Sequence, residues 1–412
     1  MPETARVNSY GHNARHHANS LDGQRGELGM SNNTLHGELG ISDRLHHFTW
    51  AWFTTTMSTG GIALVLGRTP HRFDGLTVIG EIVFILDLVL FVSICTGITM
   101  RFVLFPQAFL SSLQHPTESL FVPTFFISIM NLIANTQVYG VPHCGPWLVT
   151  TSRVLFWIYA ACTFLTAVGQ YYFLFTGEPL TLQSMTPAWI LPIFPVMLCG
   201  TLASLMGGSQ PPDQALPILV AGVTFQGLGM LTATFMYGPY LARLMTSGLP
   251  NSNLRPGMFI AVGPSSFTGL ALLGISSHLP RIYPSYTSIS SISHPEIIAD
   301  VFRIVALSVA VFLWATAFWF FSVAFVSVIC GATRKDGMSF HLVWWAFVFP
   351  NVGFTIVTID IGRALLSEGI LWLSSVMTIL LVVTWLFVGA AHIRAVWKKQ
   401  ILWPGKDEDH DQ

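Results

Sequence analysis

Ten long apolar runs divide this chain, and their length constrains its fold more than any other feature. Each run is close to or above about 20 residues, the length that an α-helix needs to cross the roughly 30 Å hydrocarbon core of a bilayer. Charged residues make up only 9% of the chain, whereas a soluble domain carries about a quarter. We therefore predict an all-α integral membrane protein with about ten transmembrane helices. The runs cover residues 47–67, 77–105, 120–139, 147–175, 188–206, 215–246, 256–279, 301–331, 341–365 and 369–397.

The segments around these runs divide the chain into three parts. Residues 1–45 are polar and lack the apolar region of a secretory signal, so we expect a disordered cytoplasmic tail. Residues 46–398 form the predicted transmembrane domain, and residues 399–412 a cytoplasmic C-terminal tail. Because the loops between runs are short, neighbouring helices should pack as antiparallel hairpins. Lysine and arginine are more frequent on the side that holds both termini, which favours cytoplasmic termini.

Odd and even runs differ in their content of helix breakers. The odd runs carry internal Pro, Gly and small polar residues, whereas runs eight and ten are nearly unbroken. The sixth run departs from this rule, since Gly222 and Pro239 interrupt it. Breakers in alternate helices predict an inner ring of five kinked helices around a central pore, with five outer helices facing lipid. The odd-run breakers lie in TTTMSTGG (54–61), at Pro123, and in LPIFPVMLCG (191–200), VGPSSFTG (262–269) and FPNVGF (349–354).

The ninth run carries polar groups that a plain lipid anchor would lack. Pro350 has no amide hydrogen, so the helix is predicted to kink there. We interpret one face of this helix as the wall of a solute pathway, with the Phe349 ring lying across it. The alternative is a buried kinked helix in which Phe349 only packs against its neighbours and Asp360 and Arg363 form an i,i+3 ion pair. The residues that helical spacing places on this face are Phe349, Gly353, Ile356, Asp360 and Arg363.

Small polar side chains recur on the odd runs at helical spacing. Their hydroxyls and amides could replace part of the hydration shell of an anion without adding a fixed charge. The alternative is that they hydrogen-bond neighbouring helices and line nothing. The candidates for pore lining and substrate contact are Thr55, Ser58, Thr59, Ser128, Asn131, Ser265, Ser266 and Asn351.

A few charged residues inside the runs are candidates for recognising an anion or a proton. Arg153 is costly in a membrane unless it pairs with an acid or faces water, so it either binds an anionic substrate or pairs with Asp87. Arg363 is a second candidate for the substrate. Asp360 and Asp87 are the candidate proton-linked residues, although Arg363 would hold Asp360 ionised.

Several classes of function lack their motifs. The sequence contains no Walker A, HExxH or GxSxG signature, so we expect no hydrolytic enzyme and no ATP coupling. The five cysteines show neither a disulfide framework nor a metal-binding spacing, so no metal or cofactor is expected. The formal net charge of −1 gives no reason to expect a nucleic-acid partner.

Six motifs carry a family resemblance: FTWAWFTTTMSTGG (48–61), TPAWILPIFPVMLCG (186–200), FQGLG (225–229), RPGMFIAVGPSSFTGLAL (255–272), WWAFVFPNVGFT (344–355) and WPGKDED (403–409). Together they resemble the fungal malic acid permeases of the tellurite-resistance/dicarboxylate transporter family. That family also holds bacterial anion channels, plant slow anion channels and fungal sulfite efflux pumps. The resemblance covers nearly the whole chain from about Phe48 to Asp409.

The resemblance implies ten helices arranged as five pseudo-symmetric hairpins, with a central pore lined by the odd helices. It implies a homo-oligomer, commonly a trimer, and Phe349 as the gate of each pore. For the malic acid branch it implies plasma-membrane transport of C4-dicarboxylates (malate, with succinate and fumarate), often linked to protons. A passive anion channel and a sulfite efflux pump of the same fold are the alternatives.

Overall fold

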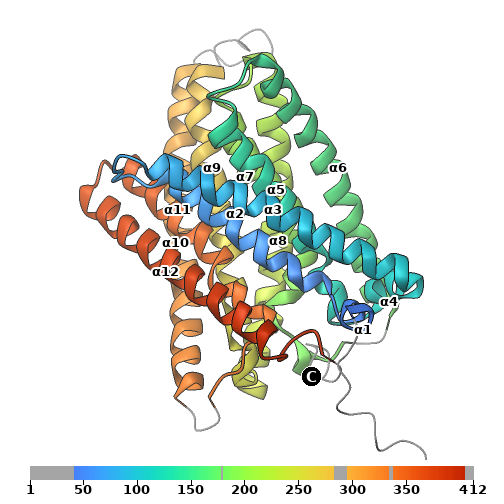
Figure 1. The fold of residues 1–412 in the computed structure, drawn as a ribbon. Helices are drawn as coiled ribbons and strands as arrows, with labels where there is room; N and C mark the ends of the chain where they lie inside the picture. The colour runs from blue at the N-terminus through green and yellow to red at the C-terminus, as the bar shows by residue number, and fades with distance from the viewer. Residues whose placement is uncertain (1–40, 178–179, 283–294, 334–336, 404–412) are drawn as a thin grey trace, which may run out of the picture. The chain divides into compact units, whose positions relative to one another are not determined.

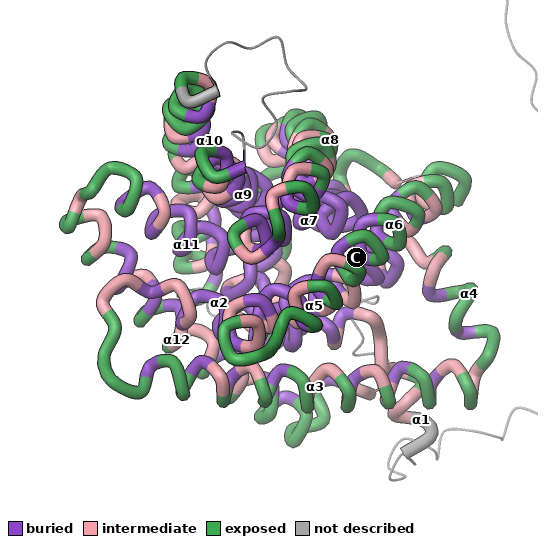
Figure 2. Tube along the Cα trace, turned by 90° about the horizontal axis from the view of Figure 1, so that it is seen from above, coloured by how far each residue is buried: buried purple, intermediate pink, exposed green. Residues whose placement is uncertain are grey.

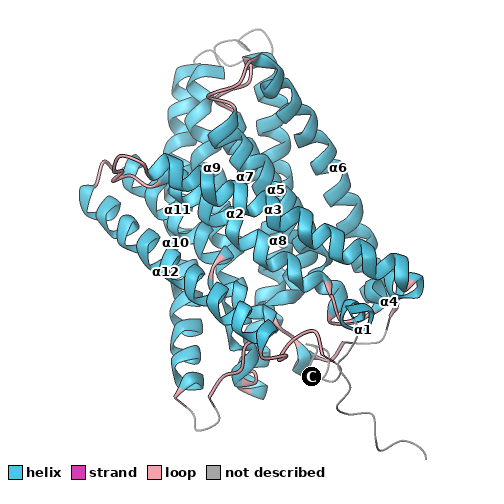
Figure 3. Cartoon of the chain, in the orientation of Figure 1, coloured by secondary structure: helices cyan, strands magenta, loops and turns pink. Residues whose placement is uncertain are grey.

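The computed structural model describes residues 41–177, 180–282, 295–333 and 337–403, and its regular structure there is helical, without strands (Figures 1 and 3). Within these ranges nine helical segments are long and apolar enough to cross a membrane. The first predicted run forms a short 3-10 turn, η1 (Trp50–Trp52), followed by α2 (Phe53–Arg68), whose α-helical part has only 16 residues. The membrane-spanning all-α fold is confirmed.

Five hairpins follow one another along the chain, each joining an inner helix to an outer one. The inner helices are α2, α5 (Val122–Asn135), α7 (Phe194–Met206), α9 (Val262–Ile282) and α11 (Phe349–Ala364). The outer helices are α3 (Leu76–Leu104), α6 (Pro146–Thr176), α8 (Pro212–Ser247), α10 (Pro295–Ala332) and α12 (Glu368–Trp397). The short helices α1 (Ile41–His46) and α4 (Pro106–Gln114) accompany the first hairpin.

Burial separates the two sets of helices. The most apolar stretches of the segments containing α5, α7, α9 and α11 are 72% to 89% buried, whereas those of the outer helices are 22% to 33% buried. Every residue of α2 from Phe53 to Leu66 is buried. Figure 2 shows the buried inner helices surrounded by outer helices that expose one face. The predicted inner and outer sets are therefore confirmed.

The sixth run, which departed from the breaker pattern, forms the outer helix α8. Two of its glycines are explained by close packing on α7: a Cβ on Gly222 would collide with Ala203, and one on Gly229 with Met197. Pro239 lies inside the continuous helix. Gly222 and Gly229 therefore mark tight helix contacts and not a pore.

Each inner helix begins after a 3-10 segment. These segments are η1, η2 (Glu118–Phe121), η5 (Pro187–Ile193), η6 (Ser252–Ala261) and η8 (Leu342–Phe347). Pro123, Pro195 and Pro350 occupy the second position of their α-helices, where the backbone N–H would have no intrahelical partner in any case. The prediction of one helix kinked at Pro350 was therefore imprecise, because α11 starts beside that proline and a 3-10 segment precedes it.

The hairpins all belong to one compact unit within residues 42–412. The predicted N-terminal tail, residues 1–45, falls almost wholly outside the described residues, and so does most of the predicted C-terminal tail. Both remain predictions.

Candidate functional site

Three phenylalanine rings from three inner helices meet where those helices begin or just after. We call Phe194 of α7, Phe267 of α9 and Phe349 of α11 the aromatic plug; each is at most 2% exposed. The rings of Phe267 and Phe349 are stacked with centroids 5.1 Å apart. Phe194 lies edge-on to both, with centroid distances of 5.7 Å to Phe267 and 6.1 Å to Phe349. These distances are in the range of favourable aromatic pairs, so the three rings form one packed unit.

Each ring of the plug lies against a glycine of another inner helix. A Cβ on Gly263 of α9 would lie 2.7 Å from the Phe194 ring. A Cβ on Gly353 of α11 would lie 2.7 Å from the Phe267 ring. On α2, a Cβ on Gly61 would lie 3.4 Å from the Phe349 ring. The glycines therefore make the space that the three rings fill.

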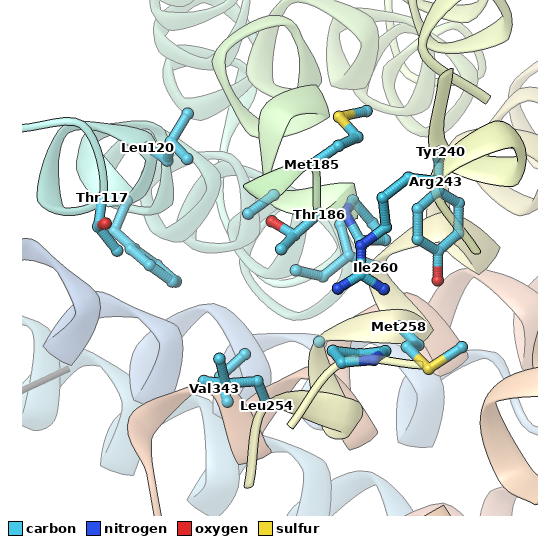
Figure 4. Close-up of a pocket in the computed structure, with 15 residues that line it drawn as sticks. Thr117, Leu120, Met185, Thr186, Tyr240, Arg243, Leu254, Met258, Ile260 and Val343 are labelled. Atoms are coloured by element: carbon cyan, nitrogen blue, oxygen red, sulfur yellow. The ribbon is translucent and has the colours of Figure 1, made fainter. Parts of the chain in front are cut away.

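A cavity opens on the side of the inner helices where their 3-10 segments lie, and we call it the vestibule. Thr117, Thr186 and the hydroxyphenyl group of Tyr240 contribute polar groups to a mostly apolar wall. Among the described residues, Arg243 of α8 is the only charged one that lines it, and in Figure 4 its guanidinium extends from the helix toward the middle of the cavity. Arg243 also donates hydrogen bonds to the carbonyls of Gln183 (3.2 Å) and Gly248 (2.6 Å). The vestibule thus presents one anchored positive charge.

A second, narrower cavity continues from the vestibule to the plug. The two share Phe121, Ile260 and Val343 in their walls, and Phe194 and Phe349 close the inner end. Its free space holds little more than one water molecule, so a four-carbon solute does not fit in this conformation.

Two threonines supply the only hydroxyls that the described residues bring to the wall of the narrow cavity. Thr54 donates its hydroxyl to the carbonyl of Ala51 at 2.6 Å, and Thr124 donates to that of Phe121 at 2.6 Å. Both hydroxyl protons therefore already have backbone acceptors. In this conformation the wall offers an anion no free hydroxyl donor from these residues.

A third cavity, wide and charged, lies at the opposite ends of the inner helices. It shares no lining residue with the vestibule or the narrow cavity. Asp360 follows Phe349 by 11 residues on α11, about 16 Å at 1.5 Å per residue. Three arginines and two aspartates line it, which leaves a net positive wall. These residues are Arg68, Arg303, Arg363, Asp300 and Asp360.

Asp360 is held by two arginines in this charged cavity. A single Arg68 nitrogen lies 2.6 and 2.8 Å from its two carboxyl oxygens, and Arg363 lies 3.6 Å away. Arg363 also donates to the carbonyl of Arg68 at 2.7 Å. The expected i,i+3 pair is present, but Arg68 of α2 makes the shorter contact. Arg68 thus ties the end of α2 to the end of α11.

The predicted polar residues of α2 face several directions. The Ser58 hydroxyl donates to the carbonyl of Trp345 at 3.2 Å, and Trp385 of α12 donates to Thr59 at 3.1 Å. Thr55 is buried, and its hydroxyl has no partner within the described residues. None of these three lines the vestibule or the narrow cavity.

The predicted residues of the other inner helices also take part in helix contacts. Ser128 shares a hydrogen bond of 2.7 Å with Thr56 of α2, and Asn131 donates to the carbonyl of Met57 at 2.7 Å. Ser265 lies 3.5 Å from the hydroxyl of Tyr237. Ser266 and Asn351 donate to carbonyls four residues earlier in their own segments.

The two predicted substrate arginines lie apart. Arg363 lines the charged cavity, whereas Arg153 lies half-buried on the outer helix α6 and lines none of the three cavities described above. In the described part of the chain no ion pair or hydrogen bond joins Arg153 to Asp87. Asp87 is instead buried between α3, α2 and α5.

Sequence reasoning missed four residues of the pathway: Phe194, Phe267, Thr54 and Arg243. A signal for Phe194 was present, because it precedes Pro195 as Phe349 precedes Pro350. Arg243 gave no such signal, since a cation near the end of an outer helix has the same pattern whether it faces lipid headgroups or a cavity.

The sequence of the chain matches known proteins over most of its length. The profile of a family described as voltage-dependent anion channel matches residues 47–393. A malic acid transport protein of Schizosaccharomyces pombe is 36% identical over 369 residues, which cover 90% of this chain and 83% of that protein. A putative malic acid transport protein of the same yeast is 37% identical, with coverage of 90% and 85%. The sulfite efflux pump SSU1 of Arthroderma benhamiae is more distant, at 26% identity over 87% of this chain and 93% of that protein.

Proposed function

Because the chain belongs to the voltage-dependent anion channel family, we propose that it transports C4-dicarboxylates, malate first and succinate and fumarate with it, between its inner helices. The relatives with the higher identities are named as malic acid transport proteins, whereas the sulfite pump is more distant. The chain works in the plasma membrane as a homo-oligomer, a trimer by family resemblance, with both termini in the cytoplasm. The vestibule then faces the cytoplasm.

The observation that carries this proposal is the alignment of the vestibule, the narrow cavity and the aromatic plug. A cavity that leads between inner helices and ends at packed aromatic rings is expected of a gated solute path and not of a receptor or scaffold. The plug is made of rings, which can rotate aside without breaking backbone hydrogen bonds. We therefore assign the gate to the plug, with Phe349 as the ring that lies against Gly61 of α2.

Substrate recognition is assigned to the two ends of this path. A dicarboxylate carries two separated negative groups, and guanidinium groups bind carboxylates well. Arg243 attracts the anion in the vestibule, and Arg363 with Arg303 attracts it in the charged cavity. Arg153 stays a weaker candidate because it is on an outer helix. None of the described residues that line the narrow cavity is charged, so they do not trap an anion there.

Uptake of radiolabelled malate into proteoliposomes tests the proposal. Uptake should saturate with malate, and succinate and fumarate should compete more strongly than chloride. Competition by sulfite with none by succinate or fumarate would favour a sulfite pump instead. Unsaturable chloride current with no uphill malate movement would favour a passive channel.

A further inference from the structure

Asp87 is an unpaired acid inside the protein. It belongs to the outer helix α3, yet its side chain turns inward and is fully buried. Neither carboxyl oxygen has a hydrogen-bond partner among the described residues. The backbone N–H of Gly60 is near, but within α2 that group serves the carbonyl four residues earlier. Glu118, in contrast, is paired with Arg101, and Asp360 with Arg68 and Arg363.

Two asparagines of α5 lie beside this acid. A Cβ on Gly60 would lie 2.5 Å from Oδ2 of Asp87 and 2.7 Å from Cβ of Asn131, so the two side chains meet over that glycine. Asn131 donates its amide to the carbonyl of Met57 (2.7 Å), and Asn135 donates to that of Gly60 (2.8 Å). The side-chain oxygens of both asparagines have no donor within the described ranges. The site therefore gathers acceptor oxygens and lacks donors.

A proton supplies the missing donor. An ionised carboxylate without hydrogen bonds is costly in an apolar surrounding, and neighbouring acceptor oxygens raise that cost. A neutral carboxylic acid carries no charge, and its O–H can donate to an asparagine oxygen.

The third hairpin has a neutral residue in the corresponding place. Gly200 of α7 packs against Gln226 of α8 as Gly60 packs against Asp87, and a Cβ on Gly200 would collide with the Gln226 side chain. Gln226 donates its amide to Thr268 of the next inner helix at 2.8 Å. The place of Gln226 in the third hairpin therefore holds a hydrogen-bond donor. At the place of Asp87 in the first hairpin, only the protonated acid is a donor.

One peptide of α2 separates this site from the aromatic plug. Gly60 faces Asp87, while its neighbour Gly61 faces the ring of Phe349, and neither glycine has a side chain to fill the space. A charge that appears at Asp87 would act on the segment of α2 that supports Phe349. We propose that Asp87 is the proton-binding site of this transporter, protonated when the plug is closed. This inference rests on the proposed function and assigns its proton linkage to one residue.

Few other titratable groups face this site in the described part of the chain. At this level α2 presents only glycine, and α5 presents asparagine amides. The turn after α5 brings Tyr139, whose hydroxyl donates to the carbonyl of Ala63 at 2.6 Å. Glu81 and Arg101 lie six and fourteen residues away on α3, about 9 and 21 Å at 1.5 Å per residue. Arg101 is therefore too far away to pair with an ionised Asp87, and Glu81 is itself an acid and cannot stabilise a second carboxylate.

The test compares wild-type protein with Asp87→Asn, which resembles the protonated acid, and with Glu81→Gln on the same helix as the control. Each is reconstituted into liposomes, and malate uptake is measured with and without an inward proton gradient. Malate exchange in the same vesicles normalises for the amount of folded protein. Wild type and Glu81→Gln should accumulate up to about tenfold more malate per pH unit if one proton is coupled. Asp87→Asn should show no response to the gradient.

The outcomes separate the inference from the function beneath it. If wild type exchanges malate but Asp87→Asn still follows the proton gradient, the assignment of Asp87 is wrong and the function stands. A response to a sodium gradient in place of the proton gradient would also overturn it. If wild type does not exchange malate at all, the proposed function fails and the inference fails with it.

Infrared spectroscopy gives a second measurement that needs no transport. At neutral pH the wild-type protein should show the carbonyl band of a protonated carboxylic acid. That band should be absent from Asp87→Asn and retained in Glu81→Gln. A wild-type spectrum without the band, or one in which Asp87→Asn keeps it, contradicts the proposal.

Discussion

Phe349 closes the narrow cavity together with two other rings, so its removal should open the path only in part. In Phe349→Ala the stacked partner Phe267 loses its neighbour, and a gap forms beside Gly61. We expect chloride leak through the reconstituted protein to rise about tenfold or more, equivalent to about 1.4 kcal/mol of barrier. Phe235→Ala, at a site 75% exposed on α8, is the control and should leave the leak unchanged. An equal chloride leak in Phe349→Ala and Phe235→Ala would mean that Phe349 is not part of the gate.

A methyl group on Gly353 should disturb the plug without removing any ring. The added Cβ would lie 2.7 Å from the ring of Phe267, so that ring must move. Overpacking of this kind costs about 1 to 3 kcal/mol. We expect Gly353→Ala to lower the thermal unfolding temperature in detergent and to raise the chloride leak.

The matched control for this change is Gly227→Ala on α8, where a Cβ has nothing within 4 Å. It should leave the leak unchanged and stabilise the helix by up to about 1 kcal/mol, because alanine is the better helix former. If Gly353→Ala and Gly227→Ala have the same chloride leak and the same unfolding temperature, the contact of Gly353 with the Phe267 ring does not shape the plug.

Polar residues show how far sequence reasoning reaches at this scale. The stripes on α2 and α5 were found correctly as polar, but helical periodicity is the same for a side chain that faces a pore and for one that faces another helix. Ser128 and Asn131 face α2. On α2 the narrow cavity is lined by Thr54, one residue before the predicted Thr55. The side of a helix that faces a cavity is fixed by tertiary packing.

The first outer helix is fixed by a buried ion pair that the sequence did not reveal. Arg101 of α3 contacts Glu118 of η2 at 2.5 Å, with both side chains 7% exposed. Arg101→Met leaves Glu118 buried and unpaired, so we expect a loss of about 3 to 5 kcal/mol of stability. Thermal unfolding followed by tryptophan fluorescence measures it.

The double variant Arg101→Met with Glu118→Gln removes both charges and is the control. It should recover a large part of the lost stability, because no charge is then left unpaired. A double variant that is less stable than the single one would mean that packing, and not the charge, stabilises this contact.

At the scale of elements, the sequence was most informative where breakers and apolar length agreed. The five inner helices were identified from Pro123, Pro195, Pro264 and Pro350 and from the glycines of the first run. The 3-10 segments before the helices were not, because proline is compatible both with a kink inside a helix and with the first turn of a new one. Gly222 and Gly229 of α8 misled for a related reason, since glycine serves both close packing and kinking.

At the scale of the whole molecule, the vestibule and the charged cavity lie at opposite ends of the path and differ in their charged residues. The effect of an arginine substitution on malate binding should therefore depend on the side from which malate is supplied. Arg243 is the only charged residue that the described part of the chain brings to the vestibule, while Arg363 belongs to the charged cavity. Arg243→Gln should raise the KM for malate about tenfold when malate is supplied on the vestibule side, equivalent to about 1.4 kcal/mol. Arg363→Gln should raise the KM to a similar extent when malate is supplied on the side of the charged cavity. Vesicles in which all the protein has one orientation allow the KM to be measured from each side.

Two controls distinguish charge from structure in this experiment. Arg243→Lys keeps the charge and should restore most of the affinity, although lysine lacks the planar fork of arginine. Thr77→Ala, at an exposed contact of Arg72, should change neither side. If Arg243→Gln and Arg363→Gln each raise the KM for malate equally from both sides, the assignment of Arg243 to the vestibule and Arg363 to the charged cavity is wrong.

No reading of single helices could have assembled the plug. Phe194, Phe267 and Phe349 come from three hairpins far apart in the chain, and only the ring of inner helices brings them together. Sequence periodicity can show that a helix is buried, but it does not give the partner that each side chain meets.

The plug contains no ring from α2 or α5, and this asymmetry sets the shape of the opening. On that flank the wall consists of Thr54, Met57, Thr124 and Ile127, which face the aromatic flank across the narrow cavity. The constriction consequently has two unlike sides. We expect the opening to come from the aromatic side, because rings can rotate aside, while the helix-packed side chains of α2 and α5 stay in place. An acid that passes would then move along that fixed wall.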